Sequence, residues 1–245
     1  EGRKTGTKVF EKLVLPLAGT PGRLANDLYD GNNLLGSTRI FECVPALTGK
    51  PVLEGGIVNS AAGSLFSYYI QGETSTNCAG LPTIVRPASF NFINGTKHLE
   101  LFNVKHFIAR WSGAREALAG MPEKWHFLDE CEGWQLYELK SNSGRYVTIP
   151  ANHPVAVGVD DWKSAGLEWM YTINALDQPF VLLRKNEAMG EGLKLRVSQA
   201  EYYEYLRAAK TNASALMGLS ANTGSGDQRV LEESLTDSSI RFKTT

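Results

Sequence analysis

The sequence predicts an α+β fold, with a mixed or antiparallel sheet and with helices mainly on one face of that sheet. Alternating apolar and polar residues indicate strands at 104–111 and 134–139, and a further strand starts at 125–128. Helix-forming residues after Ser112 indicate a helix between these strands, and an aspartate followed by an amphipathic segment at 160–173 indicates a second helix. The resulting order of elements is that of a ferredoxin-like β-α-β-β-α-β unit, which we expect around residues 104–183.

Residues 1–96 are expected to form an N-terminal α/β portion that packs on this core. Residues 1–12 are polar and charged, which is typical of a frayed terminus. The apolar run at 13–17 is short and contains a proline, which is typical of an edge strand. A turn then leads to a further candidate strand at 23–26. The segment 60–70 combines small residues with aromatic residues in the pattern of a helix.

The central α+β core is expected at 97–197. Ser112 stands where the N-cap of its first helix belongs, and a glycine and a proline end that helix. Asp160 or Asp161 caps its second helix, in which large and small apolar residues share one face. A short apolar strand at 180–183 closes the core.

Residues 198–245 are expected to complete one compact domain. Ser198 and Glu201 form a capping-box pattern at the start of a helix that runs to residue 210. The stretch 211–228 is rich in small polar residues and glycine, and is predicted to be a mobile linker. A strand-like alternation at 239–244 follows.

The composition excludes several classes of partner. The chain has 245 residues with a formal net charge of −1, and no basic run is interleaved with aromatic residues, so we expect no nucleic-acid partner. No apolar run reaches the roughly 18 residues that a membrane span requires. The first residue is Glu1, so we expect a chain that is processed or taken from a longer protein, with any membrane anchor outside it.

Signatures of metals and cofactors are weak. The four histidines are widely separated: His98, His106, His126 and His153. None of them forms the close pair with which one element presents two ligands, so we expect no metal and no cofactor. The alternative is a site shared by His106 and His126, if these residues lie on neighbouring strands. Gly49 and Lys50 resemble the end of a phosphate-binding loop, but Pro51 replaces the hydroxyl residue of that motif.

The cysteines give no clear framework. Cys43, Cys78 and Cys131 are odd in number and widely spaced, and they form no C-x-x-C pair. We interpret them as three mostly buried thiols that pack as small apolar side chains. A disulfide between Cys43 and Cys78 is the alternative in an oxidising compartment, and it would leave Cys131 free.

The candidate ligand-binding residues lie around a glycine-rich segment, because its backbone adjoins polar and aromatic side chains there. They are Glu54, Asn59, Tyr68, Tyr69 and Glu73. We expect no catalytic residue in the chain, although Glu54 and Glu73 are a possible carboxylate pair for glycoside chemistry. Four tryptophans offer further sugar-stacking surfaces, but such residues more often belong to a core. These are Trp111, Trp134, Trp162 and Trp169.

Several segments together resemble a known family. They read GRLANDL, NNLLGSTRIFECVPALTGKPVLEGGIVNSA, HLELFNVKHFIAR, WHFLDECEGWQLYEL and SIRFKTT. This pattern resembles the extracytoplasmic domain of large polytopic bacterial and archaeal membrane proteins, often labelled "6-pyruvoyl-tetrahydropterin synthase-related". These proteins are similar to the YfhO-like group and to glycosyltransferases of the GT-C architecture. The resemblance covers most of residues 20–185 and the C-terminal strand.

The resemblance implies a non-catalytic role for this chain. In GT-C enzymes the catalytic acidic residue lies in a loop between membrane helices, so the family places it outside the segment seen here. The implied partners are the transmembrane helices of the same polypeptide and a saccharide or lipid-linked sugar, and the implied location is extracytoplasmic, periplasmic or at the cell surface. The pterin label gains no support, because the zinc-binding histidine triad of such synthases is missing from the sequence.

Three functions follow as hypotheses. The first is an extracytoplasmic domain that helps a glycosyltransferase-like membrane protein to recognise a saccharide or lipid-linked acceptor. The second is a structural or interaction domain that packs on its own membrane helices and binds no sugar. The third is a free-standing carbohydrate-active enzyme that uses Glu54 and Glu73.

Overall fold

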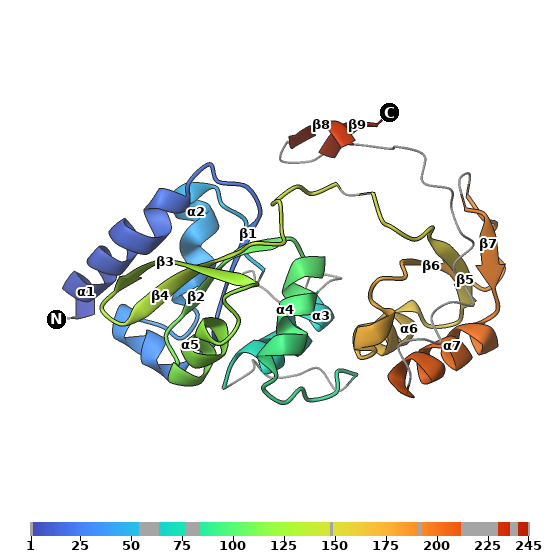
Figure 1. The fold of residues 1–245 in the computed structure, drawn as a ribbon, viewed down its shortest axis with the longest axis horizontal. Helices are drawn as coiled ribbons and strands as arrows, with labels where there is room; N and C mark the ends of the chain where they lie inside the picture. Colours follow the sequence, from blue (N-terminus) through green and yellow to red (C-terminus); the bar gives the residue numbers. More distant parts are fainter. Residues whose placement is uncertain are drawn as a thin grey trace. The chain divides into compact units, whose positions relative to one another are not determined.

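The computed structural model describes residues 2–53, 64–76, 84–147, 149–190 and 193–211, together with the backbone of 230–235 and 240–244. The chain divides into two compact units, Glu1–Tyr146 and Val147–Thr245 (Figure 1). This division falls inside the expected central core, so it differs from the boundaries that the sequence indicated after residues 96 and 197. Both units combine helices with a sheet, and the predicted α+β class is therefore confirmed.

The first unit contains a four-stranded mixed sheet. Its strands, in sheet order, are β1 (Arg23–Asn26), β2 (Val104–Ala109), β4 (Trp134–Leu139) and β3 (Trp125–Cys131). The first two strands are parallel, and β4 runs antiparallel to both β2 and β3. Phe107 in β2 lies opposite Ala25 on one side and Tyr137 on the other. The end of β1 and the end of β2 therefore meet at the same edge of the sheet.

Helical segments cover both faces of this sheet. The longer ones are α3 (Ser64–Thr74), α4 (Phe92–Leu101) and α5 (Ser112–Ala119), and the shorter ones are the 3₁₀ turns Asp30–Leu35 and Ile40–Cys43 and the helix α2 (Val44–Thr48). On one face Phe92 of α4 packs against Phe107 and Trp125, with ring centroids 5.2 and 6.1 Å apart. On the other face Ile108 and Trp134 join a core with residues of the N-terminal segment. The expectation of helices mainly on one face is wrong for this sheet.

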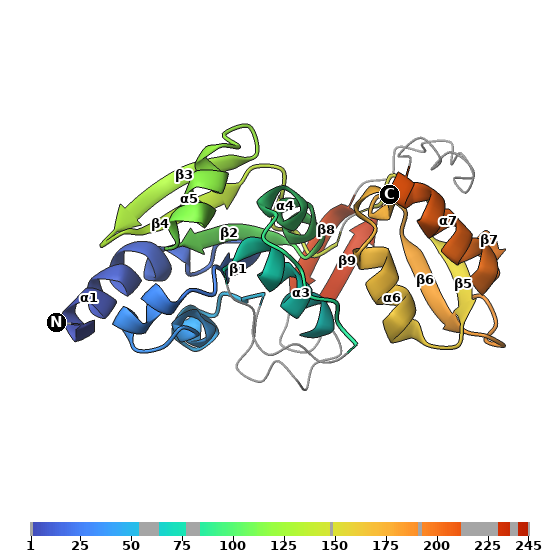
Figure 2. The same ribbon diagram turned by 90° about the horizontal axis from the view of Figure 1, so that it is seen from below.

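The N-terminal segment is helical throughout, so the predicted frayed terminus and edge strand are wrong. Helix α1 (Gly2–Val9) continues into a π-helical turn (Phe10–Val14) and a 3₁₀ turn (Leu15–Leu17), as Figure 2 shows for α1. Apolar residues at a spacing of four, Val9, Leu13 and Leu17, are buried in one core, whereas Leu15 on another side of the segment is exposed. A short apolar run is compatible with either structure, and the proline is tolerated because it stands at the start of the last turn.

The second unit is built on a three-stranded parallel sheet, visible in Figures 1 and 2. Its strands, in sheet order, are β6 (Phe180–Arg184), β5 (Val155–Val159) and β7 (Leu195–Val197). The associated helices are α6 (Trp162–Met170), the 3₁₀ turn Ile173–Ala175 and α7 (Gln199–Thr211). All five residues of the central strand β5 are buried, which is usual for a parallel strand and explains its unbroken apolar run.

The core of this unit lies between the sheet and its two helices. Val155 and Val157 pack with Tyr202, Tyr205 and other apolar residues of α7. The hydroxyl of Tyr202 donates a hydrogen bond of 2.7 Å to the carbonyl of Ala165, which joins α7 to α6. The helices thus hold the parallel strands in register from one side.

Both helix starts in this unit were predicted from the sequence. Asp161 is the N-cap of α6, and its carboxylate accepts hydrogen bonds from the backbone N–H of Lys163 at 3.0 Å and from the Ser164 hydroxyl at 2.6 Å. The Glu201 carboxylate accepts from the backbone N–H of Ser198, while the Ser198 hydroxyl accepts from the N–H of Glu201. The predicted capping box is therefore confirmed, and Asp160 is left outside the cap.

The expected ferredoxin-like sheet is not confirmed. Strands β2, β3 and β4 belong to the mixed sheet of the first unit, whereas β5 and β6 belong to the parallel sheet of the second. The final predicted strand is present as β9 (Ile240–Thr244), which pairs antiparallel with β8 (Val230–Leu235). The predicted linker lies almost entirely outside the described residues.

Candidate functional site

The ligand-binding residues expected from the sequence are only partly described. Glu54 and Asn59 lie outside the described residues, whereas Tyr68, Tyr69 and Glu73 all lie on α3. Tyr68 is 5% exposed and Glu73 is 2% exposed, so both side chains belong to the interior of the first unit. The pairing of Glu54 with Glu73 stays a prediction.

The structure joins Tyr69 and Glu73 through a residue that sequence reasoning did not select. His98 on α4 places its Nδ1 atom 2.6 Å from Oε2 of Glu73, and neither side chain is more than 3% exposed. The ring of Tyr69 meets the His98 ring edge to face at 5.8 Å. Burial raises the pKa of the Glu73 carboxyl, although the hydrogen bond with His98 opposes that shift. The cluster fastens α3 to α4.

Close helix packing explains why this cluster is buried. A Cβ atom added at Gly95 of α4 would lie 2.6 Å from Cγ2 of Thr74 on α3, so only glycine permits this approach. The backbone N–H of Asn91 also donates to the carbonyl of Glu73 at 3.0 Å. These contacts hold the Glu73 carboxylate inside the protein, where it supports the fold.

The histidine alternative does not produce a metal site. His106 on β2 and His126 on β3 are separated by β4, and both lie in register with Glu138 on that strand. Burial lowers the pKa of His106 to about 4, so this imidazole is neutral at pH 7. Within the described ranges, no group of three or more His, Cys, Asp or Glu side chains is arranged to hold a metal ion. Cys43 and Cys131 are free thiols.

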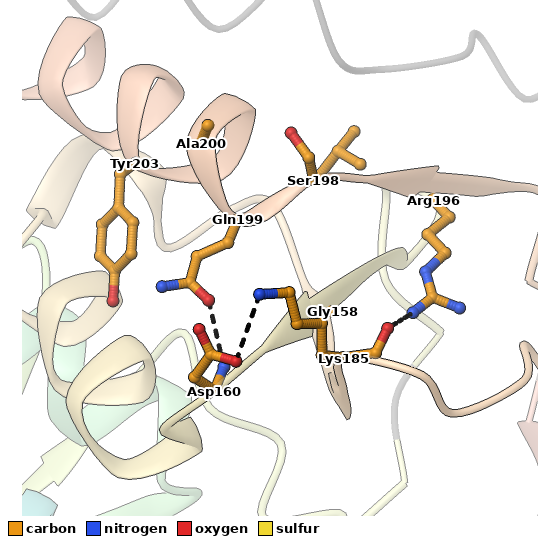
Figure 3. Close-up of a pocket in the computed structure, with 9 residues that line it drawn as sticks. Gly158, Asp160, Lys185, Arg196, Ser198, Gln199, Ala200 and Tyr203 are labelled. Atoms are coloured by element: carbon orange, nitrogen blue, oxygen red, sulfur yellow. Dashed lines mark hydrogen bonds and ion pairs between the residues drawn. The ribbon is translucent and has the colours of Figure 1, made fainter.

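A pocket lies at the carboxyl edge of the parallel sheet in the second unit (Figure 3). Its volume is about 510 Å³. Its walls come from the ends of β5, β6 and β7 and from the first turns of α7, and the lining residues are Gly158, Asp160, Lys185, Arg196, Val197, Ser198, Gln199, Ala200 and Tyr203. The carboxyl edge of a parallel sheet is the usual place for a ligand, because the chain leaves the strands there in diverging directions.

Two interactions shape this pocket. The guanidinium of Arg196 donates to the carbonyls of Glu187 at 2.6 Å and Lys185 at 2.7 Å, which holds the loop that follows β6. The backbone N–H of Asp160 donates to the side-chain carbonyl of Gln199 at 3.1 Å, which links the end of β5 to the start of α7. Figure 3 shows both links, with the Gln199 side chain lying between Tyr203 and Lys185.

The charged side chains of the pocket are open to solvent. The ammonium of Lys185 lies 3.7 Å from Oδ1 of Asp160, and the two side chains are 70% and 64% exposed. An ion pair that is this long and this exposed contributes little to folding. The carboxylate and the ammonium can therefore turn toward a ligand at little cost, with the Gln199 amide and the Tyr203 ring beside them.

Sequence reasoning missed this pocket for an identifiable reason. Asp160 and Asp161 were interpreted together as a helix start, but only Asp161 caps the helix. The available signal was the unbroken apolar run of β5 and the run of β6, each followed by charged residues. Such runs indicate buried parallel strands, whose carboxyl ends meet at one edge. Of the four tryptophans considered for sugar stacking, Trp134 is 1% exposed in the core, whereas Trp162 is 45% exposed.

Comparison with protein-family models, with curated proteins and with solved structures finds no match for this chain. The helices in the described part of the chain are all too short or too polar to cross a bilayer. The function is therefore inferred from the geometry of the pocket and from the sequence pattern.

Proposed function

We propose that this chain is the saccharide-recognition domain of a multi-pass, glycosyltransferase-like membrane protein, located on the extracytoplasmic side. In this proposal a saccharide or lipid-linked acceptor binds at the carboxyl edge of the parallel sheet. The observation that carries the proposal is the exposed pair Asp160–Lys185 beside Gln199 and Tyr203 in one pocket. The family resemblance of the sequence supports the membrane context.

The chemistry of the pocket suits a sugar. A sugar offers hydroxyl groups that both donate and accept hydrogen bonds, together with an apolar face of C–H groups. The Asp160 carboxylate accepts from hydroxyls, the Lys185 ammonium donates to them, and the Gln199 amide can do both. The half-buried ring of Tyr203 offers a flat apolar surface for the C–H face. This combination of few polar groups with one aromatic ring is typical of a binding site.

A structural or interaction domain is the second candidate function. It is favoured by apolar side chains of the first unit that are open to solvent. The most exposed are Ile93 at 65%, Leu34 at 57% and Leu47 at 56%. Scattered exposure of this kind is common in soluble domains, so it favours an interface less specifically than the pocket favours a ligand.

The free-standing enzyme is supported least. A glycosidase places two carboxyl groups on either side of the scissile bond, within reach of the substrate. Glu73 is 2% exposed and is hydrogen-bonded to His98, so its carboxylate serves the packing of α3 on α4. Saccharide recognition is therefore better supported as a function than glycoside hydrolysis.

The test is a titration of the isotope-labelled chain with neutral saccharides at millimolar concentration, followed by NMR. Backbone amides at the ends of β5 and β7 should shift, and Asp160→Asn should weaken binding about tenfold, because a hydrogen bond to a charged group contributes about 1.5–3 kcal/mol. Asp177→Asn is the matched control, since Asp177 is an exposed aspartate that precedes β6 and lies outside the pocket. An unchanged wild-type spectrum with every saccharide would favour the interaction domain instead.

A further inference from the structure

A second depression adjoins the pocket and shares its ion pair. Its volume is about 460 Å³, and it lies against the end of β6 and the start of α6. The lining residues are Val159, Asp160, Trp162, Leu182, Leu183, Arg184, Lys185 and Glu187. Asp160 and Lys185 also line the first pocket, which extends toward β7 and α7. The two depressions thus lie on opposite sides of the end of the central strand β5.

Each depression carries one aromatic side chain. The first contains Tyr203, whose ring packs edge to face on Tyr202 at 5.2 Å. The second contains Trp162, which is 45% exposed although it is the largest kind of apolar side chain. Trp162 stands in the first position of α6, directly after the cap residue Asp161, so its backbone is held by the helix start. An exposed indole at the wall of a polar depression is a stacking surface for a sugar ring, although the Lys163 ammonium lies 5.8 Å from the centroid of this ring.

We propose that the site binds an oligosaccharide of at least two sugar units and spans the junction between them. One unit lies on Tyr203 and the next on Trp162, while Asp160 and Lys185 contact both units from between them. The proposal rests on the saccharide-recognition function proposed above. Both depressions fall within the roughly 300–1,000 Å³ of small-molecule sites, so each accommodates one unit. The two oxygens of the Asp160 carboxylate allow it to accept a hydroxyl from either side.

The geometry predicts a gain in affinity with ligand length. A single unit occupies one depression and uses one aromatic ring, whereas a linked pair uses both rings without a second association step. We therefore expect a disaccharide to bind at least tenfold more tightly than its monosaccharide. Units beyond the second should add little, because both depressions are already filled.

The experiment is calorimetric titration of the full chain with glucose, maltose and maltotetraose, and with the matching series of mannose and of N-acetylglucosamine. In the series that binds, Trp162→Ala should abolish the tenfold gain from one unit to two. Tyr203→Ala should weaken the monosaccharide itself. The control is Phe127→Ala, which removes an aromatic ring that is 47% exposed in the first unit. Circular dichroism of each variant checks that the fold is intact.

The outcomes separate the two proposals. Equal affinity of the wild-type chain for one unit and two would overturn the two-unit site and leave the saccharide-recognition function standing. A length gain that survives in Trp162→Ala would also overturn the two-unit site, because the second unit would then lie elsewhere. Binding of no saccharide in any of the three series would overturn both proposals.

Discussion

Asp27 is hydrogen-bonded to the backbone of Trp111, the residue directly before helix α5, which begins 85 residues after Asp27 in the chain. Its Oδ2 atom accepts hydrogen bonds from the backbone N–H groups of Trp111 at 2.7 Å and Arg110 at 2.9 Å. Helix α5 has no side-chain cap of its own, because Ser112 is its first helical residue and the cap position is held by Trp111. The predicted capping role of Ser112 is therefore wrong. The parallel pairing of β1 with β2 brings Asp27 to this place.

The hydrogen bonds accepted by Asp27 predict that this residue stabilises the first unit. Asp27→Ala should lower the free energy of unfolding of the first unit by about 2 kcal/mol at pH 5, because two partly buried N–H groups just before α5 lose their acceptor. Urea denaturation at pH 5 measures the change. The control is Asp177→Asn, which alters an exposed aspartate and should leave the urea midpoint unchanged. A change below about 0.5 kcal/mol in Asp27→Ala would show that water replaces the carboxylate at no cost.

The same residue predicts a pH dependence. Burial raises the pKa of Asp27 to about 6 from 3.8, and the hydrogen bonds from Trp111 and Arg110 oppose the shift only in part. The folded state therefore holds the proton more tightly than the unfolded state. The stability that this proton contributes is complete below pH 4 and is lost as pH rises through 6.

Asp27→Asn isolates this effect, because the amide does not titrate. The wild-type chain should lose about 2.5 kcal/mol relative to Asp27→Asn between pH 4 and pH 7, because its pKa lies near 6 in the folded state and near 3.8 in the unfolded state. Denaturation curves of both chains across this range measure the difference. If the free energies of unfolding of the wild-type chain and of Asp27→Asn differ by the same amount at every pH, the raised pKa of Asp27 is contradicted.

The buried pair on α3 and α4 makes a third prediction. His98→Ala should destabilise the first unit by about 3 kcal/mol, because it leaves the Glu73 carboxyl in the interior without its histidine partner. Glu73→Gln should cost about 1 kcal/mol, since the amide retains a hydrogen bond with the imidazole. Thermal unfolding compares both with His126→Ala, a change at an exposed histidine on β3. Equal effects of His98→Ala and His126→Ala would contradict a stabilising role for the pair.

A buried lysine makes a fourth prediction. The ammonium of Lys50, a residue that is 2% exposed, lies within 3.2 Å of four oxygen atoms, the carbonyls of Thr20, Pro21 and Gly22 and the Thr20 hydroxyl. Lys50→Met keeps an unbranched side chain, one atom shorter than lysine, and removes the ammonium, so these acceptors lose their donor. We expect a loss of about 2 kcal/mol.

Hydrogen exchange of the 20–24 segment tests this role of Lys50. Amide protection there should fall in Lys50→Met beyond the global change, because the ammonium holds this turn together. Lys124→Met, at an exposed lysine on the same unit, is the control and should leave exchange in the turn unchanged. Full protection of the turn in Lys50→Met would mean that the carbonyls need no internal cation.

The sequence predicted local structure where neighbouring residues decide it. The strands around Phe107 and Tyr137, the cap at Asp161 and the capping box of Ser198 and Glu201 all depend on residues within a few positions, and all are present. Ser112 failed as a cap because the cap position falls on Trp111, whose backbone N–H donates to Asp27, the residue after β1, and such a contact depends on the sheet topology.

The residues of the candidate site also depend on contacts between distant parts of the chain. Tyr68 and Glu73 stand beside a glycine-rich segment, which made them plausible contacts, but tertiary packing buries both. Asp160 and Lys185 are 25 positions apart, and only the parallel pairing of β5 with β6 brings the residues that follow these strands to one edge. The apolar runs of β5 and β6 indicate buried strands, but pairing across a long connection leaves no periodic pattern, so the sequence does not show that these two strands are neighbours.

The glycine inside β5 makes the last prediction, and it concerns the pocket itself. A Cβ atom at position 158 would lie 2.8 Å from Nη2 of Arg196 and 3.2 Å from the carbonyl of Lys185. Gly158→Ala should therefore push the Arg196 guanidinium away from the loop that carries Lys185, and should weaken saccharide binding at least fivefold while costing only about 1 kcal/mol of stability. Calorimetric titration and thermal unfolding measure the two effects separately. Asp177→Asn, at an exposed aspartate outside the pocket, is the control and should leave binding and stability unchanged. Unweakened binding in Gly158→Ala would show that the hydrogen bonds from Arg196 to this loop do not shape the site.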